Sequence, residues 1–287
     1  MLYNLLYPLH TVWSALNVFR YITFRAIYAT VTAFLICFIL GPWVIEKLRL
    51  WQVGQYIQED GPARHMEKAG TPTMGGILII TAVTLSTLLW ADLANPFVWL
   101  AILTILSFGL VGFVDDYLKQ VKKRNKGLRA ASKLGLQVAT AVIIGICLYR
   151  LCNYSTMLNV PFFKAFSPQL DWGYILFVVL VIVSASNAVN LTDGLDGLAI
   201  GPVTVAAVTF MALAYVGGHV KIAQYLQLPY IAGSGELTVF CGALAGAGLG
   251  FLWFNTYPAQ VFMGDTGSLA LGAAIGTCLL YTSDAAD

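Results

Sequence analysis

Long uncharged runs are the feature of this sequence that most constrains its fold. Eight stretches between charged residues are long, or nearly long enough, to cross a membrane as helices: residues 26–45, 69–91, 93–114, 134–149, 172–192, 197–220, 237–264 and 266–283. A helix rises about 1.5 Å per residue and needs ~20 mostly apolar residues to cross the hydrocarbon core of a bilayer. The sequence therefore predicts an all-α fold, a polytopic transmembrane helical bundle.

The composition excludes the soluble alternatives. Hydrophobic residues make up 59% of the chain and charged residues 10%, whereas a soluble domain carries ~25% charged residues. The formal net charge of +2 gives no field that would attract a polyanion. We therefore expect membrane lipid as a partner and no nucleic acid.

Two of the eight stretches do not match the length of one span. Residues 134–149 are too few, so we expect that helix to continue past Arg150, whose long side chain can reach the membrane interface. Residues 237–264 are too many, and Asn255 and Pro258 predict a helix to about Phe254 followed by a loop.

The last stretch is expected to start a helix near Ser268 and to turn polar at Thr282, which is too short for a span. The prediction is seven complete helices and a partial eighth. They would form one integral-membrane domain over residues 1–281, incomplete at its C-terminus, followed by a polar, foreign tail over residues 282–287.

Glycines repeat every four residues in the last two predicted helices. This spacing, in Gly242, Gly246 and Gly250 and again in Gly272 and Gly276, places small residues on one helix face. It predicts close packing of helices within the lipid.

The basic residues predict the orientation of the chain, because Lys and Arg are retained on the cytoplasmic side. The connections after the odd-numbered stretches carry Lys47, Arg49, Arg64, Lys68, Lys119, Lys122, Lys123, Arg124, Lys126, Arg129 and Lys133. The opposite side carries Arg20, Arg25, Arg150, Lys164 and Lys221. We therefore expect the N-terminus outside and the odd-numbered connections inside.

Five aspartates would emerge on the cytoplasmic face. They are Asp115, Asp116, Asp193, Asp196 and Asp265. Independent capping residues need not share one face, whereas the residues of a site must converge. Asp115 and Asp116 also lie at a helix C-terminus, where negative charge is unfavourable unless a cation offsets it.

Clustered carboxylates without His or Cys suit a hard cation, and Mg²⁺ binds through one or two carboxylates together with phosphate oxygens. Gly264, beside Asp265, would leave room for a phosphate or metal to approach. Lys133 opens a predicted helix, whose N-terminus attracts anions. We assign Lys133 to the site and interpret the other basic residues of 119–133 mainly as retention and lipid-contact residues.

Four segments resemble a known enzyme family. They are Gly70-Thr71-Pro72-Thr73-Met74-Gly75-Gly76, Asp115-Asp116-Tyr117, residues 187–199 (Asn-Ala-Val-Asn-Leu-Thr-Asp-Gly-Leu-Asp-Gly-Leu-Ala) and residues 255–265 (Asn-Thr-Tyr-Pro-Ala-Gln-Val-Phe-Met-Gly-Asp). Together they resemble phospho-N-acetylmuramoyl-pentapeptide transferase, also called translocase I, of the polyprenyl-phosphate N-acetylhexosamine-1-phosphate transferase superfamily.

The resemblance implies ten transmembrane helices, of which this sequence supplies at most eight. It implies a multi-pass enzyme of the bacterial cytoplasmic (inner) membrane with its active site on the cytoplasmic face. The enzyme would transfer phospho-N-acetylmuramoyl-pentapeptide from UDP to undecaprenyl phosphate, giving lipid I and UMP in peptidoglycan synthesis. The implied cofactor is Mg²⁺, the substrates are UDP-N-acetylmuramoyl-pentapeptide and undecaprenyl phosphate, and a homodimer is left open.

The resemblance also assigns residues by position. Asp115, Asp116 and Asp265 would be catalytic, and Asp265 would bind the metal. The substrate-binding residues would be Lys68, Thr73, Lys133, Asn190, Asp193, Asp196, Asn255 and Phe262. Phe262 would stack on the uracil ring.

Two alternative functions remain open. A sister transferase using UDP-N-acetylglucosamine would keep the aspartates and Mg²⁺ but would not depend on a peptide on the donor. An ion-coupled transporter would place acidic residues near the middle of the membrane, whereas here the predicted positions cluster at one interface. Whether the reaction is direct attack or passes through a covalent intermediate is also left open, as is the choice of base between Asp115 and Asp116.

Overall fold

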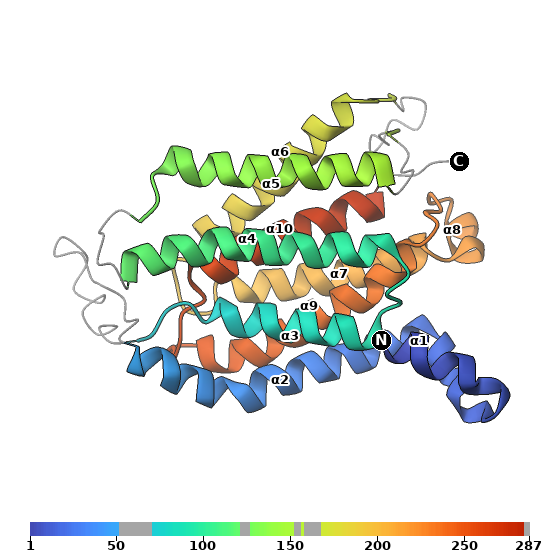
Figure 1. Cartoon of the computed structure of the whole chain (residues 1–287), viewed down its shortest axis with the longest axis horizontal. Coiled ribbons are helices and arrows are strands. Elements are labelled where there is room, and N and C mark those ends of the chain that lie inside the picture. The colour runs from blue at the N-terminus through green and yellow to red at the C-terminus, as the bar shows by residue number, and fades with distance from the viewer. Residues whose placement is uncertain (52–70, 121–126, 152–155, 158–167, 284–287) are drawn as a thin grey trace.

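The computed structural model describes residues 1–51, 71–120, 127–151, 156–157 and 168–283 (Figure 1). In these ranges the chain is helical, apart from turns, extended linkers and isolated β-bridges such as that of Met157 with Gln169. The predicted all-α helical bundle is confirmed.

Each of the eight predicted stretches corresponds to one long helix. These are α2 (Ile22–Leu50), α3 (Gly76–Trp90), α4 (Pro96–Gln120), α5 (Ala130–Leu151), α6 (Gly173–Thr192), α7 (Ile200–Gly217), α9 (Leu237–Asn255) and α10 (Gly264–Ser283). The short segments are α1 (Leu2–Leu6), η1 (Tyr7–Thr11), η2 (Ser14–Arg20), α8 (Val220–Leu226) and η4 (Ser234–Glu236).

By length and hydropathy, six of the described helices could cross a membrane: α2, α4, α5, α6, α7 and α9. Helix α3 is apolar but has 15 residues. As predicted, α5 continues past Arg150 and α9 ends close to Phe254. The chain is therefore a multi-pass membrane protein.

Exposed aromatic side chains mark both ends of the bundle. One end carries Tyr21, Tyr28, Trp99, Trp172 and Tyr225, and the other carries Trp43, Trp51, Tyr117, Trp253 and Tyr257. Tyr and Trp concentrate at the two membrane–water interfaces. The two groups therefore lie where the helices would leave the hydrocarbon.

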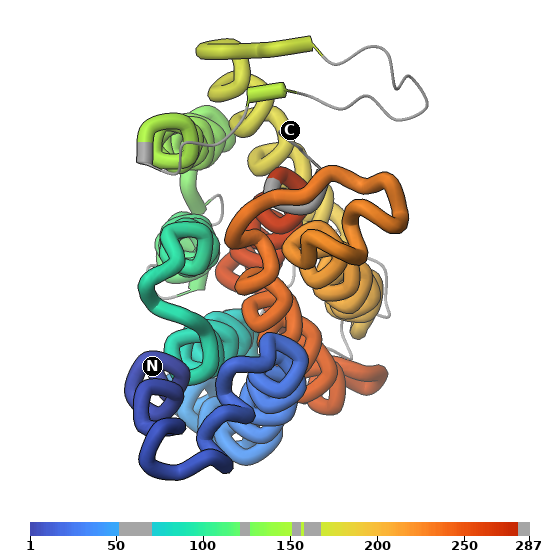
Figure 2. The backbone as a smooth tube through the Cα atoms, turned by 90° about the vertical axis from the view of Figure 1, so that its right-hand side faces the viewer, coloured from blue at the N-terminus to red at the C-terminus, as the bar shows by residue number. Residues whose placement is uncertain are grey.

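Helices α9 and α10 form the centre of the bundle (Figure 2). Helix α9 packs against α2, α3 and α7, and α10 packs against α3, α4, α6 and α7. The glycine repeats lie at these contacts, since a Cβ at Gly242 would come within 2.8 Å of Thr30 Oγ1 and one at Gly272 within 2.5 Å of the Ala185 carbonyl oxygen. The prediction of close packing at these glycines is confirmed.

Helix α10 begins earlier than expected. Its first residue is Gly264 rather than Ser268, and it has 20 residues, as many as α6. Amide groups in its first turn are bound by the carboxylate of Asp116 on α4, and this acceptor, far away in sequence, allows the helix to start four residues sooner. The expectation that this helix is short was therefore wrong.

A buried ion pair stabilises the end of the bundle where α2 begins. Arg25 is 2% exposed and forms two 2.6 Å hydrogen bonds to the carboxylate of Glu236. The same carboxylate accepts a hydrogen bond from the backbone amide of Asp92, at 3.0 Å, so the pair joins α2, η4 and the end of α3. Arg25 is thus neutralised inside the bundle and does not act as a free positive charge of a loop.

The connections bring four helix C-termini and four helix N-termini to the other end of the bundle. Helices α2, α4, α6 and α9 end there, and α3, α5, α7 and α10 begin there (left in Figure 1). The four motifs of the sequence lie at these helix ends.

Candidate functional site

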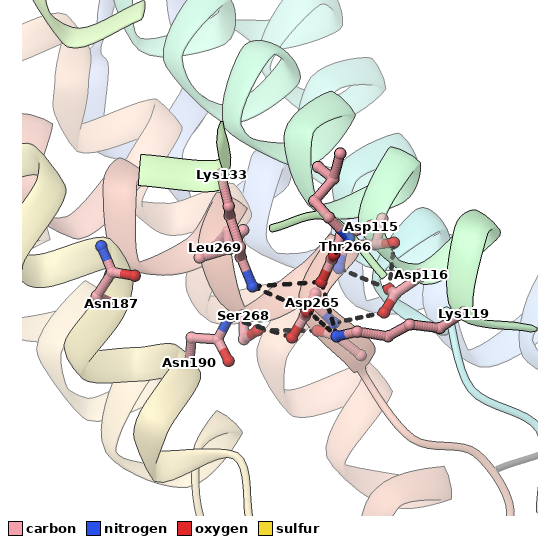
Figure 3. Close-up of polar contacts among 12 residues, drawn as sticks. Asp115, Asp116, Lys119, Lys133, Asn187, Asn190, Asp265, Thr266, Ser268 and Leu269 are labelled. Atoms are coloured by element: carbon pink, nitrogen blue, oxygen red, sulfur yellow. Dashed lines mark hydrogen bonds and ion pairs between the residues drawn. The ribbon is translucent and has the colours of Figure 1, made fainter. Parts of the chain in front are cut away.

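Two aspartate motifs meet where α4 ends and α10 begins. Asp115 and Asp116 lie near the C-terminus of α4, and Asp265 lies in the first turn of α10 (Figure 3). The helices approach closely because Gly112, one turn before Asp116, has no side chain, and a Cβ there would overlap the backbone of Asp265. The helix contact therefore places all three carboxylates together.

Two lysines bridge two of these carboxylates. Lys119 Nζ lies 2.6 Å from Asp115 Oδ2 and 2.6 Å from Asp265 Oδ2. Lys133 Nζ lies 2.9 Å from Asp265 Oδ2 and 3.4 Å from Asp115 Oδ2. The Asp115 side chain is 2% exposed, whereas that of Lys119 is 37% exposed, so Lys119 is the most exposed side chain of the four.

Lys119 was not singled out from the sequence. We interpreted it mainly as one of the retention and lipid-contact residues and assigned only Lys133 to the site, whereas the structure places Lys119 in contact with Asp115 and Asp265. Its spacing of four residues from Asp115 within one helix could have identified it, because residues i and i+4 are neighbours on a helix surface.

Asp116 faces the start of α10 rather than the lysines. Its carboxylate accepts hydrogen bonds from the backbone amide of Asp265 at 3.2 Å, the backbone amide of Thr266 at 2.8 Å and the hydroxyl of Thr266 at 2.7 Å. Asp116 is 4% exposed. It therefore acts as an N-cap supplied by another helix and fixes the turn that carries Asp265.

Groups of the protein itself offset the negative charges of Asp115 and Asp116 at the C-terminus of α4. The negative charge of Asp115 is offset by Lys119 and Lys133, and that of Asp116 by the positive N-terminal end of α10. The dipole of α4 alone does not require a metal ion.

Helix α6 contributes to the other oxygen of Asp265. Asn190, in its last turn, donates a hydrogen bond from Nδ2 to Asp265 Oδ1 at 3.1 Å. Both oxygens of this carboxylate are therefore held, one by an amide from α6 and one by the two lysines (Figure 3).

Asp193 and Asp196 follow α6 at the edge of this cluster. Burial raises the pKa of Asp193 to about 7, and the negative charges of Asp265 and Asp116 act in the same direction. Asp196 accepts a hydrogen bond from the backbone amide of Ala259 at 3.2 Å. Asp193 therefore shares the electrostatic field of the cluster, while Asp196 holds the loop after α9.

Asn255 joins two loops. Its Oδ1 accepts a hydrogen bond from the amide of Gly197 at 3.1 Å, and its Nδ2 donates one to the carbonyl of Val261 at 2.9 Å. The residue is 2% exposed. The structure thus places Asn255 beneath the loop rather than among the clustered carboxylates.

Phe262 and Thr73 lie where two distant segments run side by side. The amide of Phe262 donates to the carbonyl of Pro72 at 2.8 Å, and the amide of Gly75 donates to the carbonyl of Phe262 at 2.9 Å. Phe262 is partly exposed and Thr73 is buried. These backbone bonds bring the segment before α3 to the start of α10.

Gly264 lies between the side chains of Asp116 and Thr73. Its φ of +72° favours glycine, and a Cβ would lie 2.7 Å from Asp116 Oδ2 and 2.9 Å from Thr73 Oγ1. A side chain at this position would therefore overlap Asp116 and Thr73. Glycine is required there for packing.

Five of the predicted site residues are in direct contact in the structure: Asp115, Asp116, Lys133, Asn190 and Asp265. Thr73 and Asp193 lie beside them. Asp196, Asn255 and Phe262 lie in the adjoining loops. Lys68 lies outside the described residues.

The donor atoms suit a hard cation. Asp265 and Asp115 offer carboxylate oxygens, the ligands that Mg²⁺ prefers, although the described part of the chain holds no preformed set of three or more His, Cys, Asp or Glu ligands. Mg²⁺ commonly takes only one or two carboxylates and completes its shell with water and phosphate oxygens. The residues therefore fit such an ion together with a phosphate substrate.

Comparison with known proteins identifies clear relatives. Residues 98–283 match the model of glycosyl transferase family 4, and residues 68–80 match signature 1 of phospho-N-acetylmuramoyl-pentapeptide-transferase. Proteins of that name from Desulforapulum autotrophicum and Syntrophus aciditrophicus are 59% and 56% identical over 98% of this chain and 79% of their own length. The one from Desulfatibacillum aliphaticivorans is 60% identical, with the same coverage.

Proposed function

We infer the reaction from the fact that this chain belongs to the phospho-N-acetylmuramoyl-pentapeptide transferase family. It transfers phospho-N-acetylmuramoyl-pentapeptide from UDP to undecaprenyl phosphate, which gives lipid I and UMP. The observation that supports this best is the cluster of Asp115, Asp265, Lys119 and Lys133 at one end of a membrane bundle. There a water-soluble nucleotide and a lipid phosphate can meet.

The lysines suit the binding of phosphates. The cluster is balanced in charge, with two carboxylates against two ammonium groups. An incoming pyrophosphate would compete for the same hydrogen-bond donors, and the exposed stem of Lys119 allows its amine to turn toward it. Lys119 and Lys133 would then hold the donor while Asp115 is released.

Asp115 is our candidate for the group that handles the proton of the lipid phosphate. It is one of two adjacent carboxylates, but Asp116 is engaged by three donors from α10. The bonds that hold Asp115 come from two movable lysines and the amide of Leu128 at 2.7 Å. Of the two, Asp115 can change partners without unwinding a helix end.

We propose Asp265, with Asp115 next to it, as the residues that would hold Mg²⁺. When bound there, the ion would offset negative charge on the reacting phosphates. The chain's own contribution is to fix the direction of the Asp265 carboxylate, through Asn190 on one oxygen and the α10 turn held by Asp116.

We also propose that the end of the bundle with the carboxylates faces the cytoplasm of a bacterial inner membrane and that the N-terminus lies outside. Lys47, Arg49, Lys119 and Lys133 all lie at the end of the bundle with the carboxylates, whereas Arg150 and Lys221 lie at the other end. This separation follows the retention of positive charge on the cytoplasmic side.

The test is release of UMP by the purified protein in detergent with Mg²⁺ and undecaprenyl phosphate. We expect release with UDP-N-acetylmuramoyl-pentapeptide and not with UDP-N-acetylglucosamine, which is the donor of the sister enzyme. Asp265→Asn should lower the rate at least about a thousandfold while leaving membrane insertion unchanged, since it removes the proposed metal ligand. Equal rates with both donors, or full activity of Asp265→Asn, would contradict the proposal.

A further inference from the structure

A buried amide side chain, Gln137, and a partly buried one, Asn187, form a pair one helical turn away from the site. Gln137 on α5 is completely buried, and its Oε1 accepts a hydrogen bond from Asn187 Nδ2 on α6 at 2.6 Å. A second, longer contact of 3.5 Å runs from Gln137 Nε2 to Asn187 Oδ1. Asn187 Nδ2 also donates to the carbonyl of Val183 at 2.8 Å, which ties the amide to its own helix.

The reaction as proposed does not use this pair, and apolar packing does not explain it. Burying an amide between membrane helices is unfavourable unless it is hydrogen-bonded, and an aliphatic residue would fill the same space without that requirement. Gln137 and Asn187 can form their hydrogen bonds to each other only when α5 and α6 are aligned in one position along their axes. The pair therefore specifies this register.

The register matters because of what each helix carries. Lys133 lies four residues before Gln137, and Asn190 lies three residues after Asn187, so each is the neighbouring residue on its helix face. Lys133 and Asn190 contact the two different oxygens of Asp265, at 2.9 and 3.1 Å (Figure 3).

Helix α6 is in turn fixed to α10. The hydroxyl of Ser186, which is completely buried, donates a hydrogen bond to the carbonyl of Leu269 at 3.0 Å. Two neighbouring residues of α6 therefore bind two different helices, Ser186 binding α10 and Asn187 binding Gln137 on α5. Helix α5 packs mainly on α4 and α6 at the edge of the bundle, so its position depends on few contacts.

We propose that Gln137 and Asn187 are positioning residues that set α5 against α6 and thereby aim Lys133 at Asp265 and at the phosphates of the donor. This inference rests on the proposed function. The pair touches none of the reacting groups and acts through Lys133.

A double-mutant cycle separates this role from a general effect on folding. Gln137→Leu should lower kcat/KM for UDP-N-acetylmuramoyl-pentapeptide about tenfold and weaken its binding by a similar factor, because the lysine loses its fixed position. In a Lys133→Ala background, the same substitution should change either quantity by less than about twofold, because the residue through which it acts is gone. Binding is measured by calorimetry without undecaprenyl phosphate, so that it does not require turnover.

Thr140→Val is the matched control. Thr140 lies on the same helix, and its hydroxyl donates a hydrogen bond to the carbonyl of Leu136 in its own helix, at 2.8 Å. It should leave both quantities unchanged within about twofold. If Gln137→Leu fails to fold, Gln137→Asn is tested instead. Adding Asn187→Gln to Gln137→Asn should restore activity, because the two amide side chains then regain their combined length.

The inference would be overturned if Gln137→Leu lowered kcat/KM and donor binding equally in the wild-type and Lys133→Ala backgrounds. It would also be overturned if Asn187→Gln did not rescue Gln137→Asn. Neither result would contradict the proposed function. A wild-type protein that binds the donor but releases no UMP would instead contradict the proposed function, and the cycle on binding would still decide the role of the pair. A wild-type protein that does not bind the donor would overturn both.

Discussion

The two adjacent aspartates at the end of α4 have different surroundings although their sequence contexts are nearly the same. Asp115 binds amines from two lysines, and Asp116 binds three donors in the first turn of α10. On a helix, neighbouring residues point about 100° apart, so two adjacent carboxylates reach different partners. One residue pair thereby serves both the polar cluster and the helix that carries Asp265.

This division predicts unequal effects of two similar substitutions. Asp115→Asn and Asp116→Asn should both lower the rate of UMP release, but only Asp116→Asn should clearly lower the thermal unfolding temperature in detergent. Asparagine has one acceptor oxygen where aspartate has two, so its NH2 group would leave at least one of the three α10 donors without an acceptor, and the negative charge at the N-terminus of α10 would be lost. Thr266→Val, which removes one of the three donors, should give a smaller decrease. Equal unfolding temperatures for the two Asn variants would contradict the assignment.

The raised pKa of Asp193 predicts that the stability of the metal-free protein depends on pH. Its pKa is raised to about 7 in the folded protein by burial and by the charges of Asp265 and Asp116, against about 3.9 in an unfolded chain. Between these two values the folded state binds more protons than the unfolded state, so stability falls as the pH rises through this window. Above about pH 7 the full destabilisation is present, and below about pH 4 it is absent.

We therefore expect Asp193→Asn to unfold at a higher temperature than wild type at about pH 8 and at nearly the same temperature at about pH 4. Thermal unfolding in detergent with a chelator, measured at both pH values, tests this. Asp171→Asn is a suitable control, because this residue lies at the start of α6, at the opposite end of the bundle from the cluster. A constant difference between Asp193→Asn and wild type across the pH range would disprove the assignment.

At the scale of single elements, α2, α3 and η4 meet at the buried pair of Arg25 and Glu236. Arg25→Leu should destabilise the protein by about 3–5 kcal/mol, because it leaves a buried carboxylate without its cation. The double variant Arg25→Leu with Glu236→Leu should recover much of that loss, since no uncompensated charge is left inside. Detergent unfolding of the single and double variants measures this. A double variant less stable than Arg25→Leu would show that the pair contributes more than the neutralisation of one charge.

The elements were largely predictable from sequence, while their ends and partners were not. Charge-free runs located each long helix in the described part of the chain, because the hydrocarbon core excludes charge over a fixed length. The start of α10 was missed, since its cap, Asp116, lies 149 residues earlier. Similarly, Arg25 was counted with the loop charges because its partner Glu236 lies 211 residues away. Local patterns carry no information about contacts at such separations.

The site was likewise predictable in its location but not in its individual contacts. The convergence of the aspartates at one end could be predicted, because the spans determine at which end each connection lies. The sharing of Lys119 between Asp115 and Asp265, and the engagement of Asn255 within a loop, depend on how helices pack. Packing of this kind is decided by side-chain shape, such as the absence of a side chain at Gly112.

For the whole molecule, the proposed orientation predicts opposite accessibility of two exposed residues. Tyr225, in α8, and Tyr257, after α9, are 86% and 78% exposed and are separated by one membrane span. In a cysteine-free background, Tyr225→Cys should react with a membrane-impermeant thiol reagent in intact cells, and Tyr257→Cys should react only after lysis. Their similar exposure makes each a control for the other. Labelling of Tyr257→Cys in intact cells would reverse the proposed topology.

The cap that Asp116 provides to α10 has a consequence for the order in which the protein acquires activity. A membrane protein is synthesised from its N-terminus, so α4 is made long before α10. Until α10 arrives, Asp116 has no helix end to hold, and Asp265, which the cluster needs, does not yet exist in the chain. Lys119, four residues after Asp115 on the same helix, is already available as a partner for that carboxylate. A nascent chain would thus carry Asp115 paired with Lys119 and Asp116 without its α10 donors, and it would become competent only when the bundle is assembled.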